Sequence, residues 1–122
     1  MLLITFNRAK NTQSVINALR LVKPKFLYVF QDGQRIDNID DIDKCKSVRN
    51  VLSEIDWECE LKTNFSESNL GCGKGPSTGI QWFFENVEEG IILEDDCIPH
   101  PDFFQYCEIL LEKYRNDVRI SY

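Results

Sequence analysis

The sequence predicts an α/β domain whose mostly parallel, twisted sheet carries helices on both faces. Short apolar runs typical of buried strands alternate along the chain with segments that have the apolar spacing of helices. The runs at 2–6 and 26–30 have no polar face, which is typical of central strands. The run at 57–63 alternates apolar and polar residues, which favours a place near a sheet edge.

The first strand–helix unit is predicted from residues that start and end helices and from the spacing of its apolar residues. After the strand at 2–6, Asn11 or Thr12 can cap a helix, and Pro24 ends it. Four apolar residues of this helix have helical spacing: Val15, Ile16, Leu19 and Val22.

The second unit begins with the strand at 26–30. The turn Asp32-Gly33 follows, and the acidic stretch 40–43 indicates the N-terminus of the next helix, where negative charge is favourable. The expected buried face of that helix consists of Cys45, Val48, Leu52 and Ile55.

The second half of the chain continues the alternation. A polar, glycine-rich loop follows the strand at 57–63, then a helix through 82–84 and a short strand at 91–93. Pro101 fits the first turn of a further helix, and a last strand is expected at 118–122.

Composition limits the possible classes of protein. The 122 residues suffice for one modest domain, and a hydrophobic fraction of 43% is ordinary for a globular protein. A formal net charge of -6 argues against general nucleic-acid binding. The apolar runs are too short for a transmembrane helix, and the start of the chain does not resemble a signal peptide. The five cysteines have no CxxC spacing, which favours free thiols in a reducing, cytoplasmic environment.

Three consecutive acids, Glu94, Asp95 and Asp96, follow the apolar run 90–93. In open α/β sheets, ligands bind beyond the carboxyl ends of strands. Carboxylates about 5 Å apart repel each other by about 3 kcal/mol at an effective dielectric of about 20. A cation offsets such repulsion, and hard oxygen ligands suit Mg²⁺ or Mn²⁺ with substrate phosphates in the shell. The alternative is a solvated acidic turn.

Two further charged residues are expected at the same edge of the sheet. Asp32 follows the second strand and Arg8 follows the first. An arginine and an acid beside an acid run suit a ribonucleoside diphosphate held through a metal. Taken singly, the acid is typical of a turn and the arginine of a surface. His100 is expected to be structural or peripheral.

The glycine-rich segment 69–75 does not match the common nucleotide motifs. A phosphate-binding P-loop needs Ser or Thr after Lys74, where this chain has Gly75, and the dinucleotide fingerprint lacks its third glycine. What remains is a loop whose backbone could approach a ligand closely, or a loop that needs unusual dihedral angles before a helix.

The order of these motifs resembles that of the GT-A fold glycosyltransferases, in particular N-acetylglucosaminyltransferase I and its bacterial relatives. The acid run followed by 101–106, Pro-Asp-Phe-Phe-Gln-Tyr, is the most specific part of the likeness. The motifs that carry it are Phe6-Asn7-Arg8, Gln31-Asp32-Gly33, Asn69-Leu70-Gly71 and Leu93-Glu94-Asp95-Asp96.

The resemblance implies a Rossmann-like nucleotide-diphosphosugar transferase fold and a role for each motif. Asp96 would bind Mn²⁺ or Mg²⁺, Asp95 the ribose and Glu94 the donor sugar. Asp32 would contact the uracil and Arg8 the diphosphate. The segment containing Asn69 and Gly71 would border the donor pocket.

The resemblance also implies what is missing. Such enzymes continue well beyond residue 122, so residues 1–122 are interpreted as a single nucleotide-sugar-binding domain, truncated at its C-terminus. The expected partners are a UDP-sugar and an acceptor hydroxyl, and no catalytic base is assigned. The alternatives are a non-catalytic nucleotide-sugar-binding fragment, an interaction module or, less favoured, a Mg²⁺-dependent phosphoacceptor domain. Truncation would also leave an open sheet edge, through which a homodimer is expected.

Overall fold

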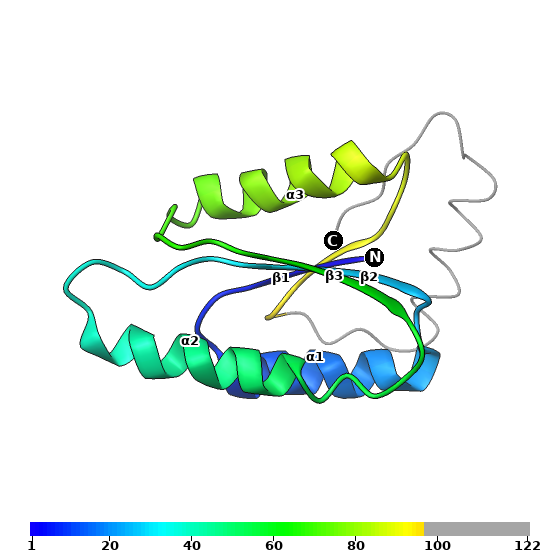
Figure 1. Cartoon of the computed structure of the whole chain (residues 1–122), viewed down its shortest axis with the longest axis horizontal. Helices are drawn as coiled ribbons and strands as arrows, with labels where there is room; N and C mark the ends of the chain where they lie inside the picture. Colours follow the sequence, from blue (N-terminus) through cyan, green and yellow to red (C-terminus); the bar gives the residue numbers. More distant parts are fainter. Residues whose placement is uncertain (97–122) are drawn as a thin grey trace.

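The computed structural model describes residues 1–96, in which strands and helices alternate (Figure 1). The elements are, in chain order, β1 (Leu2–Thr5), α1 (Ala9–Val22), β2 (Phe26–Gln31), α2 (Ile39–Leu52), β3 (Glu60–Phe65), α3 (Lys74–Asn86) and β4 (Ile92–Glu94). The helix expected from Pro101, the strand expected at 118–122 and His100 lie outside the described residues.

The strands of the described part form one sheet in the order β3-β2-β1-β4, and all neighbouring strands are parallel. Leu2 pairs with Tyr28 on one side and with Ile92 on the other. The prediction that the first two strands are central and the third lies at an edge is confirmed. So is the predicted α/β class, and the arrangement is Rossmann-like.

Helices cover both faces of the sheet, as predicted. In Figure 1, α1 and α2 lie side by side below the sheet and α3 lies above it. The core under α1 and α2 is formed by Leu3, Val15, Ile16, Leu19, Leu27, Val29, Val48, Leu52, Trp57, Ile91 and Leu93. The core under α3 is formed by Leu2, Ile4, Tyr28, Phe30, Phe83 and Ile92.

The first helix begins earlier than its sequence suggests. α1 starts at Ala9, with Arg8 at the N-cap position, so the expected caps Asn11 and Thr12 lie inside the helix. The hydroxyl of Thr12 is buried and donates to the carbonyl oxygen of Arg8 at 2.8 Å. This bond still secures the first turn, because it ties the helix to its capping residue.

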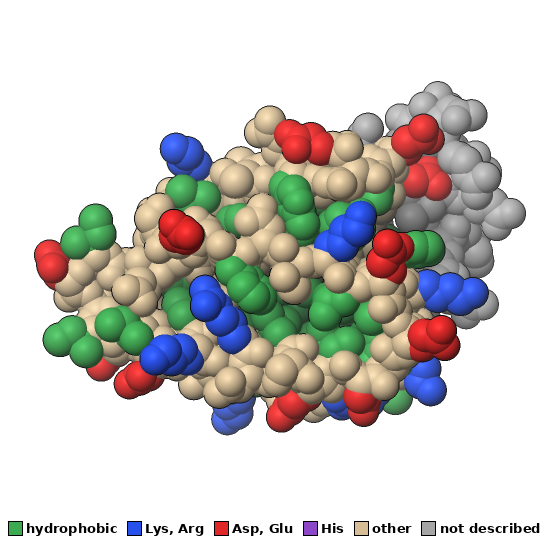
Figure 2. Space-filling view, viewed as in Figure 1, with side chains coloured by type: hydrophobic (Ala, Val, Ile, Leu, Met, Phe, Trp, Pro, Cys, Tyr) green, Lys and Arg blue, Asp and Glu red, His purple; other side chains and the backbone are tan. Residues whose placement is uncertain are grey.

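The edge strand differs from its prediction in position and in burial. β3 occupies Glu60–Phe65 rather than 57–63, and Trp57 precedes it. The Trp57 ring is buried in the core, and its indole N–H donates to the Pro24 carbonyl at 3.0 Å. Leu61 remains 40% exposed, so the apolar side of this strand is not fully covered. Figure 2 shows apolar side chains gathered on this side of the molecule, between the two helix layers.

Candidate nucleotide and metal site

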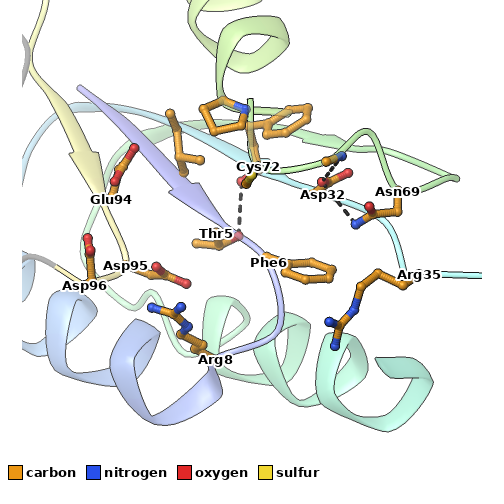
Figure 3. A pocket seen from close by; sticks show the side chains of 14 residues that line it. Thr5, Phe6, Arg8, Asp32, Arg35, Asn69, Cys72, Glu94, Asp95 and Asp96 are labelled. Carbon is orange, nitrogen blue, oxygen red and sulfur yellow. Dashed lines mark hydrogen bonds between the residues drawn. The ribbon is translucent and has the colours of Figure 1, made fainter. Parts of the chain in front are cut away.

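A pocket of about 360 Å³ opens at the carboxyl ends of β1, β2 and β4 (Figure 3). Parallel pairing brings these strand ends to one edge of the sheet, as the sequence predicted. Every site residue selected from the sequence lines this pocket: Arg8, Asp32, Asn69, Gly71, Glu94, Asp95 and Asp96. Their individual roles stay predictions.

The buried carboxylate of Asp32 organises one end of the pocket. Its Oδ1 accepts from the backbone N–H groups of Gly33 and Leu70, both at 2.8 Å. Its Oδ2 accepts from the N–H of Gly71 and from Nδ2 of Asn69, both at 3.2 Å. A carboxylate offers about four lone-pair positions, so all of them are in use. Asp32 therefore holds the glycine-rich segment in place.

Two glycines let that segment approach Asp32 closely. Gly71 adopts a left-handed conformation with φ of 94°, which side chains disfavour. Gly75 lies in the first turn of α3, where an added Cβ would come within 2.9 Å of Asp32 Oδ2. The last two residues of the expected 69–75 loop are thus helical. Their position puts the Asp32 carboxylate near the N-terminus of α3, where the helix dipole favours negative charge.

The acid run forms the other end of the pocket. In Figure 3, Asp95 points toward Arg8 from the end of β4, and Glu94 and Asp96 lie beside it. Asp95 is half-buried, whereas Glu94 and Asp96 are exposed. Burial raises the pKa of Asp95, Arg8 opposes that rise, and the charges of Asp96 and Glu94 add to it. A cation bound here would favour the ionised form of Asp95.

The acid run fits a divalent cation only in part. Carboxylate oxygens are the ligand type that Mg²⁺ and Mn²⁺ prefer. However, within residues 1–96 no three His, Cys, Asp or Glu side chains lie close enough together to hold an ion by themselves. Phosphate and water oxygens would therefore have to complete the coordination, as is usual for Mg²⁺ sites.

An ion pair that the sequence interpretation missed forms the wall of the pocket. Arg35 lines the pocket and binds the fully buried carboxylate of Asp41, with Nε–Oδ2 at 2.7 Å and Nη2–Oδ1 at 3.0 Å. Nδ2 of Asn7 also donates to Asp41 Oδ1 at 3.0 Å. The hydrogen bonds from Arg35 hold the pKa of Asp41 far below its usual range. The Arg35 guanidinium lies 5.7 Å from the centre of the Phe6 ring.

The signal for Asp41 was present in the helical spacing. Asp41, Cys45, Val48 and Leu52 recur on one side of α2, and all four are buried. A charged residue on a buried face requires a partner. The acidic stretch 40–43 taken as a whole predicts only a favourable helix N-terminus and does not single out Asp41. Thr5, Phe6 and Cys72 also line the pocket and were not selected.

Beside the pocket, the amide of Gln31 connects the end of β2 and the residue after β1 to α2. Its buried Nε2 donates to the carbonyl oxygens of Phe6 and Cys45, both at 3.0 Å. Its Oε1 accepts from Nε of Arg49 at 2.9 Å. Because Gln31 ends β2 and Phe6 follows β1, these bonds lock the strand ends relative to α2. The pocket is therefore rigidly supported before any ligand binds.

Comparisons of the chain with known protein families, with curated proteins and with solved structures found no match. Among residues 1–96, no helix combines the length and the apolar character needed to cross a bilayer. The pocket combines an arginine, an acid run and a hydrogen-bonding loop around one cavity at the carboxyl ends of the strands. Such a cavity can bind an anionic ligand together with a cation.

Proposed function

We propose that this chain binds a UDP-linked sugar together with Mn²⁺ or Mg²⁺, as the donor-binding half of a metal-dependent glycosyltransferase. One observation carries the proposal. The acid run Glu94–Asp96 and Arg8 line the same 360 Å³ pocket as Asp32 and Asn69. The pocket therefore has a charged end that suits a metal diphosphate and a polar end that suits a base.

Each residue of the charged end has a proposed task. Asp96 is exposed and free to bind the cation, and Arg8 donates to the diphosphate oxygens. Asp95 binds the ribose and Glu94 the donor sugar, following the resemblance. When bound, the metal would neutralise the charge that develops on the leaving diphosphate. The acceptor hydroxyl needs a base, and none is assigned among residues 1–96.

The runner-up function is a binding module that holds a nucleotide sugar or another partner without transferring the sugar. A phosphoacceptor domain is less favoured, because its acid pair is expected after the first strand, where this chain has Asn7 and Arg8. Incubation with a small phosphodonor followed by mass measurement separates the phosphoacceptor reading from the main proposal. A mass increase of one phosphoryl group would favour the phosphoacceptor hypothesis.

Calorimetric titration of UDP with and without Mn²⁺ tests the proposal directly. We expect UDP to bind in the presence of Mn²⁺ and to bind much more weakly after chelation. Equal affinity in both conditions, or no binding to a folded protein, would contradict the proposal.

A matched pair of variants locates the cation. Asp96→Asn keeps the size of the side chain but removes its charge, so we expect the Mn²⁺-dependent part of UDP binding to disappear. Asp43→Asn makes the same change at an exposed position of α2, away from the pocket, and should bind as the unmodified chain does. If Asp96→Asn retains Mn²⁺-dependent binding, the assignment of Asp96 is wrong.

A further inference from the structure

The carboxylate at the polar end of the pocket is already engaged. Asp32 accepts four hydrogen bonds from its own chain, at 2.8 to 3.2 Å. A base N–H could reach it only by displacing one of those donors. Three of them are backbone N–H groups that would lose a partner, and the fourth is the side-chain Nδ2 of Asn69. Asp32 is thus suited to position its neighbours, and the direct contact to a base must come from other residues.

The side-chain oxygen of Asn69, Oδ1, faces away from the hydrogen bonds that fix the orientation of its amide. Its Nδ2 donates to Asp32 Oδ2 at 3.2 Å and to the Gly33 carbonyl at 3.0 Å. Turning the amide over would place its oxygen against two acceptors, so the orientation is determined by the hydrogen bonds. In the part of the chain that the structure describes, no donor binds Oδ1 of Asn69.

Arg35 offers the complementary donor. Its Nε and Nη2 bind Asp41, while Nη1 binds no partner among residues 1–96. The charge of Arg35 is largely balanced by Asp41, and Phe6 supports its guanidinium. Such a group suits an uncharged carbonyl oxygen better than a phosphate. Arg8 differs, because it faces the acid run where the metal and diphosphate are proposed to lie.

We propose that the polar end of the pocket is a nucleobase subsite formed by Arg35 and Asn69. Nη1 of Arg35 donates to a carbonyl oxygen of the base, and Oδ1 of Asn69 accepts from a neighbouring base N–H. Asp32 acts as a positioning residue that presents Asn69. Both residues line the pocket and also border the adjoining hollow, so they flank the same space. The inference rests on the proposed nucleotide binding and deepens it.

The test compares UDP with inorganic pyrophosphate, each with Mn²⁺, because pyrophosphate lacks a base. Arg35→Lys keeps the ion pair with Asp41 but loses the second guanidinium edge. We expect it to weaken UDP binding about tenfold or more, in keeping with one charge-assisted hydrogen bond, and to leave pyrophosphate binding within about twofold. Asn69→Ala should behave likewise. Arg8→Ala should weaken both ligands.

Arg20→Lys is the matched control, because Arg20 also forms an ion pair, with Asp56 at 3.1 Å, and lies outside the pocket. It should bind both ligands normally, and thermal melts should show that every variant is folded. Equal loss of UDP and pyrophosphate in Arg35→Lys would make Arg35 a phosphate contact and overturn the subsite. Unchanged UDP binding in that variant would overturn it too. If the unmodified chain binds neither ligand, the proposed function itself fails.

Discussion

Arg35 and Asp41 form a two-point ion pair across the wall of the candidate pocket, with contacts of 2.7 and 3.0 Å. Asp41 is completely buried at the start of α2, whereas the Arg35 side chain is 50% exposed. Nδ2 of Asn7 completes the shell of the carboxylate. The ion pair ties the segment after β2 to α2, and the bond from Asn7 ties the segment after β1 to the same carboxylate. Together they give the pocket a fixed wall before ligand binding, which lowers the cost of ordering it.

Asp41→Asn should destabilise the fold and remove part of its pH dependence. The hydrogen bonds from Arg35 lower the pKa of Asp41 in the folded state. An acid with a lowered pKa contributes stability above its unfolded pKa, about 4, and this contribution is lost as pH falls through the folded value. Urea unfolding should thus show the largest difference in the free energy of unfolding between wild type and variant, the stability gap, near neutral pH. The gap should narrow below about pH 4.

Asp43→Asn is the matched control for that experiment, since Asp43 is exposed on the same helix. Its free energy of unfolding should equal that of the wild type both near neutral pH and below about pH 4. A gap for Asp41→Asn that stays constant from neutral to acidic pH would show that its charge does not contribute.

Binding of Mn²⁺ and UDP should weaken as the solution is acidified. Burial, together with the charges of Asp96 and Glu94, raises the pKa of Asp95. Because a bound cation favours the ionised form, a raised pKa means that protons compete with the metal over a higher pH range than usual. Calorimetry over a series of solutions from neutral to acidic pH should show the affinity falling as the pH is lowered, and Asp95→Asn should flatten this dependence. If the unmodified chain binds Mn²⁺ and UDP equally well at neutral and acidic pH, ionised Asp95 does not contribute to their binding.

Gly75→Ala should weaken UDP binding although the residue does not line the pocket. Its Cβ would come within 2.9 Å of Asp32 Oδ2 and would push that carboxylate away from the segment it holds. We expect a loss of about tenfold, equivalent to about 1.4 kcal/mol. Gly73→Ala, two residues earlier, has nothing within 4 Å of its added Cβ and should bind normally. Similar behaviour of the two variants in the titration would argue against the role of Asp32.

A homodimer could also form through the outer edge of β3, which lies at the opposite side of the described sheet from β4. Within residues 1–96, β3 pairs with β2 on one side only, and its Leu61 and Phe65 side chains are 40% and 36% exposed. Pairing of two such edges would bury these groups and satisfy the free backbone donors and acceptors. Sedimentation should show a concentration-dependent dimer that Leu61→Lys weakens. A strictly monomeric profile at high concentration would refute this prediction.

The central places of β1 and β2 and the edge place of β3 were predictable from the sequence, because the pattern of apolar and polar residues differs between central and edge strands. β1 and β2 lack a polar face, and a strand that is covered on both faces lies inside a sheet. The end of α1 was predictable for a similar reason, since Pro24 closes the helix signal two residues after Val22. Its start at Ala9 was not, because the backbone there is secured by Thr12 from within the helix.

The site was predictable in location but not in its internal bonding. Parallel strands bring their carboxyl ends together, so Arg8, Asp32 and the acid run had to lie at one edge. Which acceptor binds which donor depends on loop geometry over long sequence separations. Asp32 with Leu70 is such a pair, and Arg35 with Asp41 is a local one that was hidden within a run of acids.

The pairing of Leu2 with Ile92 has a consequence for the newly made protein. Parallel neighbours cannot be joined by a hairpin, and closing so long a loop is slow. On the ribosome, one edge of β1 therefore stays unpaired until β4, about ninety residues further along the chain, has been synthesised. A nascent chain that stalls before β4 would lack the acid run and would expose an apolar strand edge to other chains, where chaperones would be expected to act.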